Sequence, residues 1–270
     1  MPELPEVETT RRALEPLLVG ETIAALEIRE PRLRWPVNPE LPARLKQRRI
    51  ISLQRRGKYL LIETDAGTLI WHLGMSGSLR FLENPGAPAA HDHVDIVLES
   101  GARVRFNDPR RFGSVDLSTV PEQHWLLENL GPEPLSQDFD VEYLITACRG
   151  RRVAVKVLLM NSRVVTGVGN IYANEALFHA RIHPTRAAGR ISRRRLGTLV
   201  VGVKRVLNSA ISAGGTTLRD YVSGDGRPGY FQQTLTVYGR GGAECVECGT
   251  AIKHITLGQR ATYYCPRCQR

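Results

Sequence analysis

The chain has 270 residues, 42% of them hydrophobic, and its 37 Lys and Arg against 27 Asp and Glu leave a formal charge of +10. This length can bury a substantial core and predicts about two domains. The positive balance indicates a polyanionic partner, with nucleic acid as the first candidate. A membrane surface is disfavoured, because no stretch reaches about 18 apolar residues and neither terminus carries a basic amphipathic helix. The acidic N-terminal residues lack the basic segment of a signal peptide, so we expect a cytoplasmic location.

The N-terminal half predicts one helix followed by short strands. Pro5 suits the first turn of a helix, Glu6 lies at its favourable end, and Gly20 should stop it. Pro16 should kink or shorten the last turn. The β-prone segments that follow are typical of a β-sandwich or barrel, and they cover residues 22–29, 50–54, 59–63, 68–73, 94–98 and 103–106.

The pattern becomes helical beyond a breaker-rich linker at residues 131–138. The clearest helix is 192–213, where apolar residues recur every three or four positions before Gly214 and Gly215. We therefore predict an α+β protein with an N-terminal domain at 1–130, a helical domain at 131–225 and a C-terminal module at 226–270. Residues 218–230 predict a polar, glycine-rich loop that is either a plain connector or a binding loop.

Four cysteines form two C-x₂-C pairs separated by 16 residues, namely Cys245, Cys248, Cys265 and Cys268. This spacing is typical of a tetrahedral zinc site. Two disulfides are the alternative, but reduced thiols in an intracellular protein favour one structural Zn²⁺. A zinc-held hairpin between the pairs would present Lys253, His254 and Arg260 to an anion. Cys148 stands apart and is expected to be a half-buried residue without chemistry.

A glycine turn, Gly167-Val-Gly-Asn170, precedes a predicted helix at 171–178. Free backbone N–H groups at such a helix start can bind a phosphate, although an ordinary turn between helices needs the same glycines. The basic run Arg149-Gly-Arg-Arg152 and Lys156 lie shortly before this turn. Such runs are usually solvated, but here they add cationic side chains to a basic domain.

Two turns of the β-rich half carry apolar side chains that either wedge into a duplex or belong to the core. Phe112 follows Arg110 and Arg111 in one turn, and Met75 lies in a glycine-flanked turn. The residues alone favour the core.

Lys58 directly precedes a predicted strand. Its side chain is a phosphate ligand, a catalytic cation or a solvated charge, and the spacing does not decide between them. His91 and His93 lack further metal ligands, so a DNA contact or a structural hydrogen bond is favoured.

The N-terminus offers a nucleophile, because removal of Met1 would make Pro2 a secondary amine. An α-amino group titrates at about 7.7–8.0, against about 10.4 for lysine, so more of it is unprotonated at neutral pH. Glu3 beside it suits proton transfer. The alternative is an ordinary acidic terminus, which is the usual case.

Taken together, these motifs resemble the bacterial formamidopyrimidine-DNA glycosylase family, which repairs 8-oxoguanine. The resemblance runs from end to end and rests on residues 2–8, 58–61, 72–77, 91–94, 108–113 and 167–175, on the four cysteines and on 259–262. Asn161-Ser162 departs from the acidic residue and polar partner expected there. The resemblance implies a flattened β-sandwich domain, a helix-two-turn-helix domain and a Cys₄ zinc finger, with duplex DNA between them and the protein a monomer.

The same resemblance implies the chemistry and the roles of single residues. The Pro2 amine attacks C1′ of a flipped nucleotide to displace an oxidised purine, Glu3 assists opening of the sugar ring, and β- then δ-elimination cut the strand. Lys58 is implied in β-elimination and Arg260 in δ-elimination, and Glu6 lies near the damaged base. The implied void-filling residues are Met75, Arg110 and Phe112, with Arg110 facing the orphaned cytosine. The implied phosphate contacts are Lys58, His72, Asn170 and Arg260, the further DNA contacts are His91, Arg110 and Arg151, and residues 225–230 lie in a base-capping loop.

Two other functions fit part of the sequence. An endonuclease VIII-type glycosylase for oxidised pyrimidines shares Pro2, Glu3, the finger and the helical domain, but the set Met75, Arg110 and Phe112 favours the purine-directed branch. A zinc-ribbon DNA-binding protein without catalysis explains the charge and the cysteines but not the N-terminal Pro-Glu. Membrane binding is a distant third.

Overall fold

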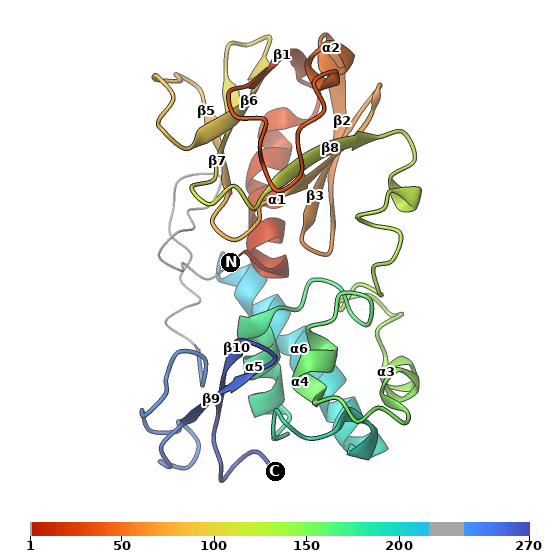
Figure 1. The fold of residues 1–270 in the computed structure, drawn as a ribbon, viewed down its shortest axis with the longest axis vertical. Coiled ribbons are helices and arrows are strands. Elements are labelled where there is room, and N and C mark those ends of the chain that lie inside the picture. The colour runs from red at the N-terminus through yellow and green to blue at the C-terminus, as the bar shows by residue number, and fades with distance from the viewer. Residues whose placement is uncertain (1, 216–234) are drawn as a thin grey trace. The chain divides into compact units, whose positions relative to one another are not determined.

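The computed structural model describes residues 2–215 and 235–270, so the predicted loop at 218–230, with the base-capping residues 225–230, lies outside the described residues (Figure 1). Contacts within the chain define two compact units. The first unit is Met1–Glu128 with Ala213–Gln232, and the second is Asn129–Ser212 with Gln233–Arg270.

The first unit opens with α1 (Leu4–Leu18), whose start is a capping box. Glu3 is the N-cap, and the Glu6 carboxylate accepts the Glu3 backbone N–H at 2.8 Å, which satisfies a donor that a helix start leaves free. Pro16 lies in the last turn, and α1 ends two residues before Gly20, which has a φ of 94°. Val7, Leu14 and Leu18 are buried, whereas Leu17 is 40% exposed.

Eight strands follow, and all pairs are antiparallel: β1 (Thr22–Ile28), β2 (Arg48–Arg56), β3 (Tyr59–Thr64), β4 (Gly67–His72), β5 (Ser78–Leu82), β6 (Asp92–Leu98), β7 (Arg103–Asn107) and β8 (Ser114–Ser118). Their order is β5-β7-β6-β1-β2-β3-β4-β8. The short helices α2 (Leu41–Leu45) and η1 (Pro121–Gln123) complete the unit. The sequence patterns missed β5, β8 and α2, each of only five residues.

The sheet divides into two facing halves where β1 meets β2. These strands pair at only two positions, Thr22 with Arg49 and Ile23 with Arg48, so the sheet turns a corner there. Trp71 on β4 and Phe106 on β7 then pack edge to face across the core, with ring centroids 5.4 Å apart. The predicted sandwich is confirmed, because one buried cluster contains residues from both halves.

The second unit contains α3 (Val141–Cys148), α4 (Val155–Leu159), α5 (Asn170–His179), η2 (Ala188–Arg190), α6 (Arg193–Ser212) and the hairpin of β9 (Lys253–Leu257) and β10 (Arg260–Tyr264). The predicted helix at 192–213 is therefore correct to within one residue at each end. Every residue of α5 from Ile171 to Phe178 is buried, so this helix is the centre of the unit. Among the described helices, none has the length and apolar character needed to cross a membrane.

The hairpin and the helical part of this unit share a core. Gly258 and Gln259 connect β9 to β10, and both have positive φ, of 56° and 59°, as a two-residue type I′ turn requires. Phe178 of α5 packs with Val237, Ile252, Cys245 and Cys265 in one buried cluster. The cysteine module is therefore anchored to α5.

Candidate functional site

The N-terminal residues are held at the start of α1. Pro2 directly precedes the N-cap Glu3, and both are buried, with Glu3 only 1% exposed. Glu6, expected near the substrate, also has a structural task, because its carboxylate holds the Glu3 N–H. A carboxylate at this position faces the positive end of the helix dipole. The start of the sequence, MPELPE, thus holds Pro2 and the neighbouring Glu3 carboxylate in place at the start of α1.

Lys58 and His72 lie close together at the end of the β2–β3 hairpin. Tyr59, next to Lys58, pairs with His72 across β3 and β4, and their rings are 4.8 Å apart. The Nδ1 atom of His72 accepts the Gly74 N–H at 3.0 Å, which leaves Nε2 as the protonated nitrogen of a neutral ring. Burial, with the nearby charges of Lys58 and Arg34, lowers the pKa of His72 to about 4. A neutral N–H donor beside an ammonium suits a phosphate oxygen.

The structure brings Met75, Arg110 and Phe112 together. They line a single pocket of about 660 Å³ whose other walls are Arg32, Leu33, Arg34 and Arg111. Phe112 is 39% exposed, and the Arg110 guanidinium lies 4.8 Å from its ring centroid. The core position that the residues alone favoured for Phe112 is wrong. An exposed ring with a cation on its face, among four arginines, has the character of a duplex-inserting surface.

A buried carboxylate that the sequence analysis missed connects the two turns carrying these side chains. Asp108 accepts the Ser76 hydroxyl and the Gly113 N–H, each at 2.7 Å, and is fully buried. His93, also buried, contacts the Asp108 carbonyl oxygen at 2.9 Å, whereas His91 is exposed. The only available signal was an Asp at the start of a turn, where its side chain commonly binds nearby N–H groups.

The predicted glycine turn forms, and Asn170 is the first residue of α5. Gly167 has a φ of 81°, which favours glycine, and Gly169 is the N-cap. The Oδ1 atom of Asn170 is buried and has no hydrogen-bond partner among the described residues. Because buried polar atoms are nearly always satisfied, this amide has the character of a ligand-contacting group at a helix N-terminus.

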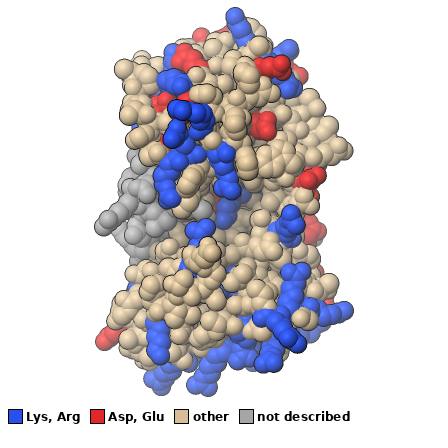
Figure 2. All heavy atoms as spheres, viewed as in Figure 1, with Lys and Arg blue, Asp and Glu red and all other residues tan. Residues whose placement is uncertain are grey.

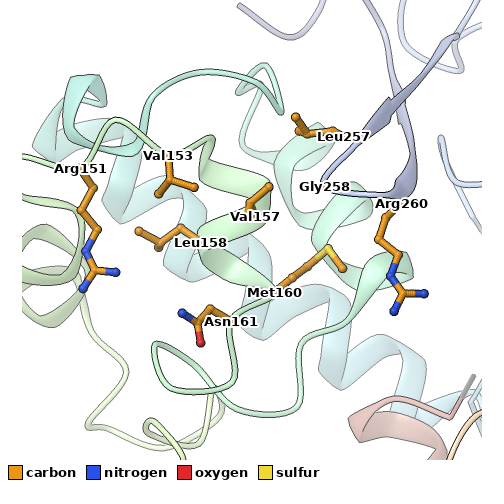
Figure 3. Close-up of a pocket in the computed structure, with 9 residues that line it drawn as sticks. All are labelled: Arg151, Val153, Val157, Leu158, Met160, Asn161, Leu257, Gly258 and Arg260. Atoms are coloured by element: carbon orange, nitrogen blue, oxygen red, sulfur yellow. The ribbon is translucent and has the colours of Figure 1, made fainter.

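Arg151 and Arg260 lie on opposite sides of a pocket of about 490 Å³ in the second unit (Figure 3). Between the two guanidinium groups the lining is largely apolar, with Val157 and Met160 in the middle and Asn161 below them. Arg260 is exposed at the first position of β10, directly after the hairpin turn. The hairpin thus fixes a cation at its tip.

Lys156, which was predicted to be one of the cations available to DNA, is instead buried, so that prediction is wrong. The side chain is fully buried, and its ammonium donates to the Ala261 carbonyl at 2.9 Å and to the Thr262 hydroxyl at 2.6 Å. A buried ammonium is stable only with such acceptors. Lys156 therefore attaches α4 to β10 beside Arg260.

Glu175 is a second buried charged side chain that holds another segment in place, and the sequence did not predict this role. Its carboxylate, 2% exposed, accepts the backbone N–H groups of Thr236, Val237 and Tyr238 and the Thr236 hydroxyl. One buried anion thus satisfies four donors of the segment that enters the finger.

The four cysteines fit a zinc ion. Their Sγ atoms all lie within 4.8 Å of one another, with Cys245 and Cys268 at 3.9 Å and Cys248 and Cys265 at 3.5 Å. A tetrahedron with Zn–S bonds of about 2.3 Å has edges of about 3.8 Å. None of the cysteines is in a disulfide, so that alternative is wrong and the cluster binds one structural Zn²⁺. Within the described residues it is the only such cluster, and it does not include His91 or His93.

Cys148 has no part in this site. It ends α3, is 2% exposed, and burial raises its pKa to about 11. A protonated, buried thiol is a poor nucleophile, and Cys148 is buried more fully than the half-buried position expected from the sequence.

Three family models match consecutive parts of the chain. They are the formamidopyrimidine-DNA glycosylase N-terminal domain at residues 1–115, the formamidopyrimidine-DNA glycosylase H2TH domain at 130–222, and the zinc finger found in FPG and IleRS at 242–270. The chain is 59% identical to formamidopyrimidine-DNA glycosylase from Pseudomonas putida GB-1 and 57% identical to the enzyme of that name from Stutzerimonas stutzeri A1501, each over all of both chains.

Solved structures agree with these sequence matches. The MutM (FPG) protein of Thermus thermophilus is 40% identical with a TM-score of 0.89, covering 99% of this chain and 98% of that one. The Lactococcus lactis Fpg in complex with abasic-site DNA is 34% identical with a TM-score of 0.93, covering all of both chains.

The matching family models, the zinc cluster and the fold show that this chain is a DNA repair glycosylase with a zinc finger. More particularly, the chain belongs to the formamidopyrimidine-DNA glycosylase family, whose members excise oxidised purines from DNA.

Proposed function

We propose that this enzyme excises 8-oxoguanine and formamidopyrimidines from duplex DNA through a Schiff base on Pro2 and then cuts the strand by β,δ-elimination. The observation that carries the proposal is the position of Pro2, directly before a buried carboxylate, Glu3, at the capped start of α1. Relatives solved with Fapy-dG DNA and with abasic-site DNA support the substrate class.

In the proposed reaction, removal of Met1 frees the Pro2 amine, whose nitrogen attacks C1′ with its lone pair and gives up its proton. The bond from C1′ to the base breaks, and the base leaves with the electron pair of that bond and takes up a proton. The Pro2 nitrogen then forms an iminium with C1′ as the C1′–O4′ bond opens, and Glu3 protonates O4′. Loss of a C2′ proton expels the 3′-phosphate, with proton transfer assigned to Lys58. Loss of a C4′ proton expels the 5′-phosphate, assigned to Arg260, and leaves a one-nucleotide gap with phosphates at both ends.

The remaining side chains hold the substrate in this proposal. His72 and Lys58 contact phosphate from one unit, and Asn170 and Arg260 from the other. Met75, Arg110 and Phe112 fill the space left by the flipped nucleotide, with Arg110 toward the orphaned cytosine. His91 and Arg151 add contacts to the duplex. Zinc is structural and takes no part in the chemistry.

Borohydride trapping tests the proposal directly, because it reduces an iminium to a stable covalent adduct. The wild type is incubated with duplexes that carry 8-oxoguanine opposite cytosine or dihydroxythymine. A variant extended at its N-terminus, in which Pro2 is locked in a peptide bond, serves as the matched control. We expect an adduct that is strongest on 8-oxoguanine and absent in the extended variant.

Other outcomes decide between the remaining functions. A stronger adduct on dihydroxythymine would assign the enzyme to the endonuclease VIII-type branch. Tight binding of both duplexes without adduct or strand cleavage would leave a DNA-binding protein.

The proposal also includes the organisation and location of the protein. We propose three domains at 1–130, 131–225 and 226–270, a monomeric state and a cytoplasmic location.

A further inference from the structure

One stretch of the second unit has no acidic residue. From Ala176 to Gly215 there is no Asp or Glu, while the stretch contains eight cations, namely Arg181, Arg186, Arg190, Arg193, Arg194, Arg195, Lys204 and Arg205. A solvated protein surface normally mixes charges of both signs. This composition therefore calls for a partner with negative charge.

The fold gathers most of these side chains. The Arg195 guanidinium donates to the carbonyl oxygen of Arg181 at 2.7 Å and to a main-chain oxygen of the last residue, Arg270, at 2.6 Å, so the start of α6 is attached to both segments. Burial and the nearby charges of Arg186 and Arg194 lower the pKa of Arg195. We name Arg181, Arg186, Arg190, Arg193, Arg194, Arg195 and Arg270 the arginine cluster.

Little negative charge compensates this cluster. Among the described residues, Arg193 pairs with the exposed Glu142 of α3, and Arg195 donates to a main-chain oxygen of the last residue, Arg270. Arg181, Arg190, Arg194 and Arg270 are exposed. Figure 2 shows Lys and Arg gathered on this part of the second unit, over α3 and the beginning of α6, with few Asp or Glu among them. Like charges held this closely repel one another, which a bound polyanion would relieve.

The arginine cluster is continuous with Arg151. The backbone N–H of Gly189 donates to the Arg151 carbonyl, and that of Ala188 donates to the Val153 carbonyl, each at 2.9 Å. Arg190 follows directly in the chain. Arg151 itself lines the pocket that ends at Arg260, so cations extend from that pocket along η2 to the start of α6 (Figure 3).

We propose that the arginine cluster binds backbone phosphates of the duplex that flanks the lesion and so lengthens the DNA footprint of the enzyme beyond Arg151. This inference rests on the proposed function only in that DNA reaches Arg151. Phosphate contacts of this kind add affinity without reading sequence, and each releases counterions from the DNA.

The test compares two duplexes with the same lesion analogue, one just long enough to cover the lesion site and one extended by about one helical turn, or about 10 bp, on each side. The variant is Arg190→Gln, Arg194→Gln and Arg270→Gln combined. Its matched control removes three exposed cations of the first unit by Arg44→Gln, Lys46→Gln and Arg48→Gln. Zinc content and circular dichroism show whether each variant is folded.

The wild type and the control should bind the extended duplex more tightly than the short one, and the cluster variant should lose most of that gain. The slope of log K against log salt on the extended duplex should fall by about 2 to 3, or about 0.9 for each phosphate that the variant no longer neutralises. Equal length dependence and slope in all three proteins would overturn the inference. The inference would also be overturned if the wild type bound vesicles of anionic lipid through the arginine cluster while its affinity for DNA did not depend on duplex length.

The result of this binding experiment can be distinguished from the result of the borohydride experiment. Length-dependent binding through the cluster can persist when trapping fails, which would contradict only the proposed chemistry. Trapping on the short duplex with no length effect would contradict only the arginine cluster.

Discussion

His72 shows how the fold sets the charge of one functional residue. Its pKa of about 4 in the folded chain lies below the usual value of about 6.5. Between these values the unfolded chain binds a proton that the folded chain does not. His72 therefore contributes stability that is fully present above about pH 6.5 and is lost as the pH falls toward 4.

The amide oxygen of a His72→Gln variant can still accept the Gly74 N–H. We expect this variant not to lose stability through residue 72 as the pH falls. The difference in the free energy of unfolding between wild type and variant should shift in favour of the variant by up to about 3 kcal/mol as the pH falls from about 7 to about 4. Urea unfolding across this range measures it. Release of zinc by acid affects both proteins alike, so parallel curves would contradict the assigned pKa.

Asp108 is the residue on which the shape of the pocket with Phe112 depends. Asp108→Asn replaces one acceptor oxygen by an N–H donor, so either the Ser76 hydroxyl or the Gly113 N–H faces a mismatched partner. We expect a loss of about 1–3 kcal/mol in stability. Thermal unfolding against the exposed control Asp65→Asn measures this, and equal melting temperatures would show that Asp108 does not fix the two turns.

At the scale of elements, the finger is attached to the helical part of its unit through buried charged side chains as well as through zinc. Lys156 connects α4 to β10, and Glu175 connects α5 to residues 236–238. These contacts hold the hairpin that presents Arg260.

We expect Glu175→Gln to loosen the segment at 236–238, because an amide offers one acceptor oxygen where the carboxylate offers two. The buried N–H groups left without a partner should cost about 2–3 kcal/mol. Hydrogen exchange should increase at residues 236–238 while that of the first unit stays unchanged. The control Glu244→Gln is exposed at the finger and should behave as the wild type.

At the scale of the whole molecule, each unit has its own core, and only one of them contains the zinc site. The three tryptophans, Trp35, Trp71 and Trp125, all lie in the first unit. Chelation of zinc should disorder the finger and expose Phe178, which packs with Cys245 and Cys265. Tryptophan fluorescence should stay unchanged while the far-ultraviolet dichroism of the second unit falls.

Single substitutions sharpen this prediction. Cys265→Ser should abolish the one zinc per chain that the wild type binds, whereas Cys148→Ser should retain it, because Cys148 lies outside the cluster. A change of tryptophan fluorescence on chelation would show that the two units are not independent in stability.

Local pattern was enough for much of this protein. The four cysteines, the period of α6, the alternating strands and the Pro-Glu terminus depend on neighbours in the chain or on fixed spacing, so the sequence determined the zinc site, the α+β class and the motifs that place it in its family. The exposure of individual side chains and their hydrogen-bond partners could not be predicted in this way. Whether Phe112 lies in the core, whether Lys156 is free to meet DNA and which groups Asp108 and Glu175 hold depend on side chains distant in sequence. Burial and hydrogen-bond satisfaction are properties of the packed chain, and only the tertiary structure decided them.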